Sequence, residues 1–345
     1  MIRFECDYSE GCIEKIQNAL IKSNLEQTPG YGMDTHCERA RDIIRKLCKR
    51  EDADIQFLVG GTQANMTLIA AALRPHQGVV AADTGHINVH ESGAIEATGH
   101  KVLPIPGRDG KIATQQIAEV LNKHFSDAHA EHTVQPGMVY LSQPTENGTV
   151  YSAAELRDIS AICRNYGVYL YIDGARLGYA MAACPEITFE LMAEVADAFY
   201  IGGTKVGALF GEALVLLHPS LKKDFRYILK QRGGMLAKGR LLGIQFECLL
   251  EDDTYLAISR HAVDLAKRIR AAGVAKGWPI YCDSPTNQQF FIVPDDQLAI
   301  LSKKYSYDIW EKLPDNKTAI RFCTSWATFS EHVEELISDI ESLPD

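Results

Sequence analysis

Short apolar runs rich in β-branched residues recur along the first two-thirds of the chain and alternate with segments of helical length. Such runs are typical of strands buried on both faces of a parallel sheet, with helices in the connections. The pattern therefore predicts an α/β fold with a mostly parallel, seven-stranded sheet. The expected strands lie at residues 55–59, 78–82, 102–105, 138–141, 168–172, 199–201 and 213–217.

The helical segments carry apolar residues with the 3.6-residue period of an amphipathic helix. Before the first strand, Ala40, Ile43, Ile44 and Leu47 share one helix face. Asp34 precedes them and is a suitable N-cap, because its carboxylate can accept a hydrogen bond from the first free amides of the helix.

The alternation ends near residue 245, where a long helical stretch begins. Extended runs follow at 289–293 and 319–324, and a helix is expected from Glu331 onward. This change predicts a smaller α+β C-terminal domain, and a length of 345 residues also favours two domains over one core. We expect an N-terminal segment at 1–20 that packs on the small domain, a large α/β domain at 21–245 and a small domain at 246–345.

Composition excludes several classes of function. The formal net charge is −10 and the pI is near 5.6, so the chain lacks the basic surface that a nucleic-acid backbone requires. The nine cysteines include no C-x-x-C pair, which argues against a disulfide framework and a zinc ribbon. No run approaches the ~20 apolar residues of a membrane span, and the N-terminus does not resemble a signal peptide. A cytoplasmic protein without membrane or nucleic-acid partners is expected.

Ligands of parallel α/β sheets bind beyond the carboxyl ends of the strands, so the residues that follow each strand are candidates for the site. The strand at 168–172 is followed by Asp173-Gly174-Ala175-Arg176. A carboxylate here can pair with a pyridine nitrogen and keep it protonated. The alternative is that Asp173 only caps the next helix.

The strand at 199–201 leads into Gly202-Gly203-Thr204-Lys205. A lysine that is buried at a strand end has a lowered pKa and supplies the free amine that forms a Schiff base. A lone lysine is usually a solvated surface charge, but Lys205 and Asp173 follow successive strands. Together they indicate a site for pyridoxal 5'-phosphate.

Two further strand ends fit this cofactor. After the strand at 55–59, Gly60-Gly61-Thr62 leads into a helix expected at Asn65–Leu73, whose N-terminus could bind a phosphate group; Thr62 could also be a simple N-cap. After the strand at 78–82, His86 could stack on the pyridine ring or act as acid or base. Glu91 could orient His86 or hold a catalytic water.

Six runs in this order resemble the threonine aldolases, which belong to the β-eliminating lyase branch of the fold type I, aspartate-aminotransferase-like pyridoxal phosphate enzymes. They are G-G-T-Q-A-N at 60–65, G-H-I-N-V-H-E-S-G at 85–93, T-E-N-G at 145–148, Y-I-D-G-A-R-L at 171–177, Y-I-G-G-T-K at 200–205 and R-F-C-T-S-W at 321–326. The resemblance covers nearly the whole chain and implies the fold type I architecture.

The resemblance also implies roles for individual residues. Lys205 corresponds to the Schiff-base lysine, Asp173 to the partner of the pyridinium nitrogen and His86 to the histidine that stacks on the ring. The remaining expected contacts are Gly61 and Thr62 with the phosphate, Thr204 and Arg176 with the cofactor, and Arg176 and Arg321 with the carboxylate of the substrate. The alternative for Arg321 is a surface ion pair.

The chain departs from the family pattern at two places. Glu146 stands where the family often has a histidine near the substrate hydroxyl, and Glu5-Cys6-Asp7 stands where an Arg-Ser-Asp sequence is common. The serine that helps to hold the carboxylate is therefore replaced by Cys6 or supplied by Ser9. Glu146 could act as the base, or it could cap the turn at 145–148 while His86 and Glu91 handle the proton.

The function that the resemblance implies is cleavage of L-threonine, L-allo-threonine and similar β-hydroxy-α-amino acids to glycine and an aldehyde. Another β-elimination, or amino transfer, on the same cofactor is the alternative, because these reactions share the lysine and the aspartate. A protein that only carries the cofactor has no need to bind the carboxylate of a substrate. The two arginines therefore argue against a non-catalytic carrier. The glycine-rich segment 231–239 corresponds to a loop that approaches the neighbouring subunit, which implies a homodimer or homotetramer with shared active sites.

Overall fold

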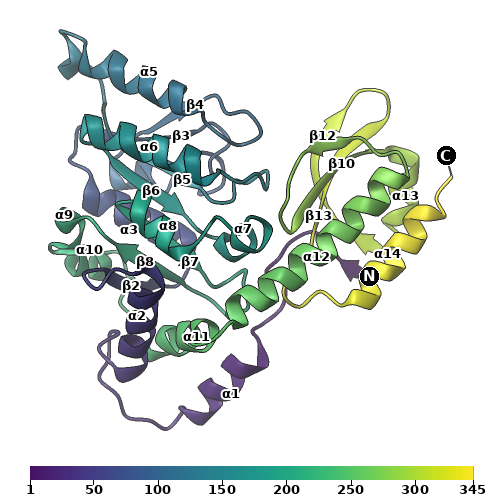
Figure 1. Cartoon of the computed structure of the whole chain (residues 1–345), viewed down its shortest axis with the longest axis horizontal. Helices are drawn as coiled ribbons and strands as arrows, with labels where there is room; N and C mark the ends of the chain where they lie inside the picture. The colour runs from purple at the N-terminus through teal and green to yellow at the C-terminus, as the bar shows by residue number, and fades with distance from the viewer. Residues whose placement is uncertain (345) are drawn as a thin grey trace.

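The computed structural model describes residues 1–344 and consists of a larger and a smaller lobe (Figure 1). The larger lobe is built on a seven-stranded sheet with the strand order β2-β8-β7-β6-β5-β3-β4. Its strands are β2 (Asp54–Leu58), β3 (Gln77–Ala82), β4 (Val102–Ile105), β5 (Gln135–Ser142), β6 (Tyr169–Asp173), β7 (Ala198–Gly202) and β8 (Glu212–Leu216).

All seven predicted strands are confirmed to within a few residues at their ends. The sheet is mostly parallel, as expected, except that β8 runs antiparallel to both of its neighbours, β2 and β7. The loop between β7 and β8 contains only residues 203–211, which is too short for the helical crossover that a parallel pair requires.

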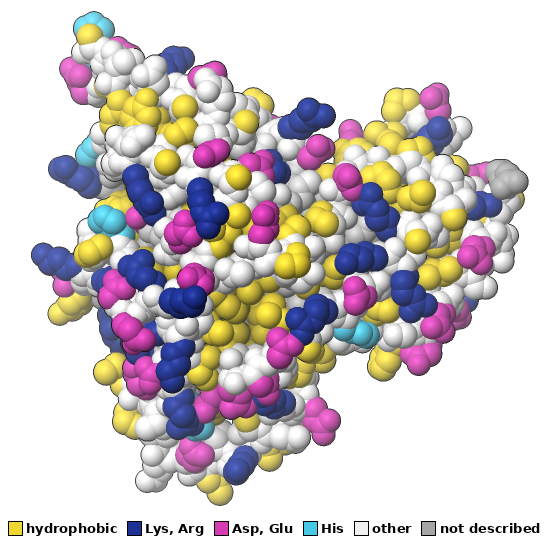
Figure 2. Space-filling view, viewed as in Figure 1, with side chains coloured by type: hydrophobic (Ala, Val, Ile, Leu, Met, Phe, Trp, Pro, Cys, Tyr) yellow, Lys and Arg dark blue, Asp and Glu magenta, His cyan; other side chains and the backbone are white. Residues whose placement is uncertain are grey.

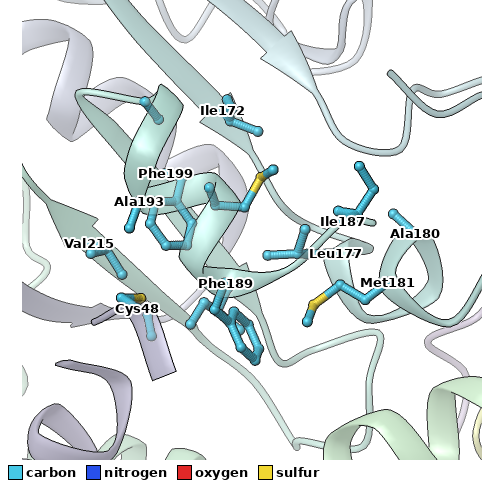
Figure 3. Packing of buried hydrophobic residues seen from close by; sticks show 14 of the residues in the cluster. Cys48, Ile172, Leu177, Ala180, Met181, Ile187, Phe189, Ala193, Phe199 and Val215 are labelled. Atoms are coloured by element: carbon cyan, nitrogen blue, oxygen red, sulfur yellow. The ribbon is translucent and has the colours of Figure 1, made fainter. Parts of the chain in front are cut away.

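Successive side chains along each strand point to opposite faces of the sheet, so a hydrophobic core lies on each face. Ile172, Phe199 and Val215 point into one core together with Leu177 and Phe189 from neighbouring helices (Figure 3). The residues one step away along the same strands, such as Tyr171, Tyr200 and Leu214, belong to the core on the opposite face. This two-sided burial explains why the strands read as nearly continuous apolar runs.

Helices cover both faces of the sheet. They are α1 (Glu14–Lys22), α2 (Thr35–Cys48), α3 (Gly61–Ala72), α4 (His86–Val89), α5 (Thr114–Phe125), α6 (Ala153–Tyr166), α7 (Leu177–Ala183), α8 (Phe189–Val195), α9 (Pro219–Lys222), α10 (Phe225–Gln231) and α11 (Arg240–Leu250). The predicted N-cap of α2 is confirmed, because the Asp34 carboxylate accepts a 2.8 Å hydrogen bond from the Cys37 amide. Helix α3 begins at Gly61 with Gly60 as its N-cap, so the alternative that Thr62 is the N-cap is wrong.

The smaller lobe contains a four-stranded antiparallel sheet in the order β12-β13-β10-β9. Its elements are α12 (Thr254–Ala275), β9 (Ile280–Cys282), β10 (Gln288–Pro294), α13 (Asp295–Leu301), β12 (Asp308–Leu313), β13 (Lys317–Cys323) and α14 (Ser330–Glu341). The two predicted extended runs correspond to β10 and β13, and the predicted closing helix is α14. Helix α12 passes from the larger lobe into the smaller one (Figure 1).

The N-terminal residues cross between the lobes. Strand β1 (Ile2–Arg3) pairs with β11 (Tyr305–Ser306), and Phe4 is buried in the core of the smaller lobe. Helix α1 instead contributes Ile16 to the core of the larger lobe. The described residues thus place β1 on the smaller lobe and α1 on the larger one, while the domain boundaries at residues 20 and 245 stay predictions.

On the face shown in Figure 2, acidic and basic side chains are interspersed and no large area carries one sign of charge. Among the described residues, none of the helices is both long and apolar enough to cross a bilayer.

Candidate functional site

The candidate site lies at the carboxyl ends of β5, β6 and β7, where the loops after these strands face the N-terminus of α3. An inner cavity of about 200 Å³ is lined there by residues that include His86, Asp173 and Lys205. An adjoining outer cavity of about 370 Å³ includes Trp310 and Arg321 of the smaller lobe. The cavities share His86 and Lys205, so the predicted groups from both lobes meet at one place.

Lys205 follows β7 and lies at the junction of the two cavities. Burial lowers the pKa of its amine, and the positive charge of Arg176 lowers it further. Asp7, Asp173 and Glu212 oppose this shift without reversing it. Both leading causes favour the uncharged amine, which is the nucleophilic form of a lysine.

Asp173, the last residue of β6, is the most heavily hydrogen-bonded carboxyl group of the site. Its Oδ1 accepts from the Tyr200 hydroxyl at 2.5 Å and from the Ala175 amide at 3.0 Å. Its Oδ2 accepts from the Tyr140 hydroxyl at 2.6 Å and from Nδ2 of Asn65 at 3.2 Å. The bond to Ala175 is a local cap, but the other three come from distant elements and fix the carboxyl group at the cavity wall.

Asn65, in the first turns of α3, connects the carboxyl group of Asp173 with that of Glu91. Its Nδ2 also donates to Oε1 of Glu91 at 2.7 Å, and its Oδ1 accepts from the Tyr171 hydroxyl at 2.8 Å. Sequence reasoning did not single out Asn65. The signal was present in the G-G-T-Q-A-N run, where Asn65 lies one turn into the helix that faces the site.

His86 begins α4, and its Nδ1 lies 2.7 Å from Oε1 of Glu91, whose side chain is fully buried. Burial by itself would lower the pKa of His86. The hydrogen bond to Glu91 and the negative charge of Asp173 outweigh this effect, and the pKa is raised above its ordinary value. The predicted arrangement, in which Glu91 orients His86, fits this geometry.

Glu146 lies beside His86, and its Oε1 accepts hydrogen bonds from the His86 amide at 2.9 Å and the Ser142 hydroxyl at 2.6 Å. Both donors lie outside the turn at 145–148, whose capping was one of the two alternatives for Glu146. Burial raises the pKa of Glu146, and the negative charge of Asp173 adds to the shift. The observed contacts therefore connect Glu146 to the start of α4.

Arg176 lines both cavities and forms a two-point ion pair with Asp7, at 2.7 and 2.9 Å. Asp7 also accepts a 2.9 Å hydrogen bond from Asn287 of the smaller lobe. Burial would raise the pKa of Asp7, but the charges of Arg176 and Lys205 prevail and lower it to about 2. Sequence reasoning placed Asp7 only within the departing E-C-D run and gave it no role.

Arg321 lies on β13 with its side chain largely buried, which differs from the alternative of an exposed surface pair. Its guanidinium donates to Gln288 at 2.8 Å and to the carbonyl of Glu5 at 3.0 Å, and it pairs with Asp308 at 2.9 Å. Its Nε is buried and has no hydrogen-bond partner in the described part of the chain. Arg321 can therefore offer a further donor to an anion.

Four other predicted residues lie in different surroundings. Gly61 and Thr62 line the inner cavity at the N-terminus of α3, and a Cβ atom at Gly61 would lie 2.7 Å from the Tyr200 hydroxyl. Thr204 lines the same cavity, but its hydroxyl is directed to Glu212, as described below. Ser9 is exposed and contacts Cys6 at 3.2 Å, and neither residue lines the two cavities.

Comparisons with known proteins agree with this geometry. The family model for β-eliminating lyases matches residues 7–293. A low specificity L-threonine aldolase of Pseudomonas aeruginosa is 31% identical over 98% of this chain and 96% of its own length. A solved threonine aldolase of Leishmania major is 41% identical, with a TM-score of 0.96 and 99% of each chain covered.

More distant structures share the architecture alone. A 4-hydroxyphenylacetaldehyde synthase of Rhodiola rosea superposes with a TM-score of 0.76 at 13% identity, over 98% of this chain and 82% of that one. The predicted fold type I architecture is confirmed. Because the family match covers most of the chain and the aldolase relatives cover nearly all of it, the chain belongs to the β-eliminating lyase family, within its threonine aldolase branch.

Proposed function

We propose that this protein is a pyridoxal 5'-phosphate-dependent aldolase that cleaves L-threonine, L-allo-threonine and similar β-hydroxy-α-amino acids to glycine and an aldehyde. One observation carries the proposal. A buried lysine with a lowered pKa, a carboxyl group at a neighbouring strand end and a carboxylate-paired histidine line one cavity, with two arginines at its mouth. Its aldolase relatives support the same reaction.

The residues of the inner cavity fit pyridoxal phosphate. The N-terminus of α3 offers free amides at Gly61 and Thr62 for the phosphate group. Residue 61 has to be a glycine, because a side chain there would collide with the Tyr200 hydroxyl. Asp173 can pair with the pyridine nitrogen, His86 can lie against the ring, and Lys205 can form the covalent link. When bound, the cofactor supplies an electron sink for the electrons of the Cα–Cβ bond.

Arg176 and Arg321 are the residues that we propose to bind the carboxylate of the amino acid. They reach the outer cavity from different lobes, so a carboxylate between them is held from two directions. Asp7 orients Arg176 through two hydrogen bonds, and the free Nε of Arg321 provides an unused donor. Fixing the carboxylate orients the Cα–Cβ bond, and this orientation decides which bond breaks.

We propose that His86 and Glu91 take the proton of the substrate hydroxyl. Glu91 engages Nδ1 of His86, which leaves Nε2 as the ring nitrogen for proton exchange, either directly or through a water. Glu146, with its raised pKa and its bond to the His86 amide, positions the histidine in this scheme. Ser9 and Cys6 have no role in it.

We further propose that the protein acts as a homodimer or homotetramer in the cytoplasm. Large apolar side chains are exposed around the start of α2 and on α10, among them Met33 and Tyr227, near the glycine-rich segment 231–239. All nine cysteines are free, as expected in a reducing compartment. Light scattering of the purified protein would give the oligomeric state, and cell fractionation would test the location.

The reaction is tested by incubating the purified protein with L-threonine and L-allo-threonine. Release of acetaldehyde with an equal amount of glycine is expected. Formation of a 2-oxo acid, or amino transfer to a 2-oxo acid acceptor, would replace the aldolase by an eliminating lyase or an aminotransferase.

The Lys205→Ala variant tests whether this lysine forms the covalent link to the cofactor. This variant should lose turnover and the visible absorbance of lysine-bound pyridoxal phosphate, because the inner cavity contains no second lysine. Borohydride trapping of the wild-type protein should place the cofactor on Lys205, and attachment to another lysine would overturn the assignment.

A further inference from the structure

Glu212 is a buried carboxyl group of the inner cavity to which no role has been given above. It is the first residue of β8 and pairs with Gly202 of β7 and Leu58 of β2. It therefore lies between the loop that precedes α3 and the loop that carries Lys205. Only 4% of the residue is exposed.

The hydrogen bonds around Glu212 define which of its oxygens can carry a proton. The hydroxyl of Thr204 donates to Oε1 of Glu212 at 3.2 Å, while it accepts from the Gly211 amide at 2.9 Å. Oε1 is therefore an acceptor. Oε2 is buried and has no hydrogen-bond partner among the residues that the structure describes. A protonated carboxyl group has one acceptor oxygen and one donor O–H, so the proton belongs on Oε2.

The surroundings of Glu212 favour the protonated form. Burial raises its pKa to about 8; the positive charge of Lys205 opposes this rise and the negative charge of Asp173 adds to it. The other titratable groups that face it are the hydroxyls of Tyr171, Tyr200 and Tyr255, whose own pKa values are raised, so they stay uncharged. Lys205 is the only cation in this group, and its pKa is lowered.

A buried O–H without an acceptor is costly, and a phosphate oxygen would satisfy it. Because the hydroxyl proton of Thr204 is used by Glu212, Thr204 cannot offer the same proton to a phosphate. A phosphate group at the N-terminus of α3 would share the inner cavity with Glu212. An ionised carboxylate would repel that group, whereas a protonated one can bind it.

We propose that Glu212 is a cofactor-binding residue whose protonated carboxyl group donates a hydrogen bond from Oε2 to the phosphate group of pyridoxal phosphate. This inference rests on the proposed function. Thr204 then acts as a positioning residue. Its hydroxyl donates to Oε1 of Glu212, so the proton of the carboxyl group is carried by Oε2. Binding of the phosphate stabilises the protonated form, so the affinity for the cofactor decreases as the pH rises above about 8.

The test measures the dissociation constant of pyridoxal phosphate by absorbance titration of cofactor-free protein between pH 6.5 and about pH 10. The wild-type affinity should fall by about tenfold per pH unit above pH 8. Glu212→Gln keeps a neutral donor and an acceptor, so it should bind with near wild-type affinity at pH 7 but lose this fall. Glu212→Leu removes the donor and should bind roughly 10- to 100-fold more weakly.

Pyridoxal, which has no phosphate group, serves as the matched ligand. Its affinity should be the same in the wild-type protein and in both Glu212 variants. Asp197→Asn is the matched control variant, because Asp197 is another mostly buried carboxyl group with a raised pKa, but it lies outside the site and accepts from the Leu170 amide. This variant should keep the wild-type pH profile for pyridoxal phosphate.

Two results would overturn the proposal. One is an identical fall of affinity above pH 8 in the wild type and Glu212→Gln. The other is an equal loss of affinity for pyridoxal and pyridoxal phosphate in Glu212→Leu, which would show that Glu212 acts on Lys205 instead. A protein that binds no pyridoxal phosphate at any pH would refute the proposed function itself, so the two failures are distinguishable.

Discussion

At the scale of single residues, the site depends on side chains that hold other side chains. Asn65 donates to Glu91 and Asp173 at the same time, and Tyr171 fixes its amide group. This network of hydrogen bonds fixes the carboxyl groups of Glu91 and Asp173 relative to each other. A shift of either carboxyl group would move the other.

Asp173→Asn tests the partner of the pyridine nitrogen. The variant should still bind pyridoxal phosphate, because the amide keeps the shape of the carboxyl group. Its turnover should fall roughly 10²–10³-fold, the size of effect seen when one preorganised electrostatic group is lost. Near-normal kcat with threonine would show that Asp173 does not sustain the electron sink.

Glu146→Gln separates positioning from proton transfer. The amide can still accept from the His86 amide and the Ser142 hydroxyl, so aldehyde release within about tenfold of wild type is expected. A loss of ~10²–10⁴ in kcat would instead identify Glu146 as the base.

Glu146→Ala is the companion variant. It leaves the buried donors without an acceptor and should reduce the free energy of unfolding by about 1–3 kcal/mol. A change in kcat/KM for threonine relative to kcat/KM for allo-threonine would assign Glu146 a part in stereochemical preference.

At the scale of elements, the strand ends explain which residues meet. The sheet brings the carboxyl ends of β5, β6 and β7 side by side, so Ser142, Asp173 and the loop to Lys205 reach one edge. Strand β13 provides the opposite wall, where its antiparallel register places Arg321 directly across from Asp308 of β12.

Arg321→Lys should chiefly weaken binding of the amino acid, because an ammonium group cannot reproduce the planar, two-point contact of a guanidinium with a carboxylate. We expect KM for threonine to rise by a factor that corresponds to about 2 kcal/mol, while kcat changes less. Arg268→Lys is the matched control, since Arg268 is an exposed arginine of α12 that pairs with Glu334. Equal kinetics in both variants would remove Arg321 from the site.

At the scale of the whole molecule, Asp7 connects three parts of the chain. It belongs to the N-terminal segment, pairs with Arg176 of the larger lobe and accepts from Asn287 of the smaller lobe. The ion pair is buried, so it contributes to the position of one lobe against the other as well as to the orientation of Arg176.

Asp7→Asn should reduce the free energy of unfolding by about 3–5 kcal/mol at neutral pH, because it leaves a buried guanidinium without its counter-charge. The pKa of Asp7 is lowered from 3.8 to about 2, so its contribution is complete above pH 4 and is lost as the pH falls toward 2. Urea denaturation between pH 7 and pH 2.5 should show a constant difference between wild type and variant that narrows below about pH 4. A difference that persists unchanged at pH 2.5 would contradict the assignment.

The order of the elements and the candidate residues at the strand ends could be predicted from the sequence alone. Strands that are buried on both faces require apolar residues throughout, and this requirement is visible without coordinates. Lys205, Asp173 and His86 stood out because each follows such a run. Strand β12 was not predicted, since all six of its residues are exposed or half-buried and three of them carry charge.

The partners that surround these residues could not be predicted and depend on how the chain folds in three dimensions. Tyr140 and Tyr200 read as ordinary core positions of their strands, yet their hydroxyls hold Asp173. Asp7 meets Arg176 from a distant part of the sequence. Glu212 meets Thr204 only because the loop between β7 and β8 folds back on itself. Hydrogen bonds and charge effects of this kind depend on distances of a few ångströms between separate elements, and local patterns of residues do not contain those distances.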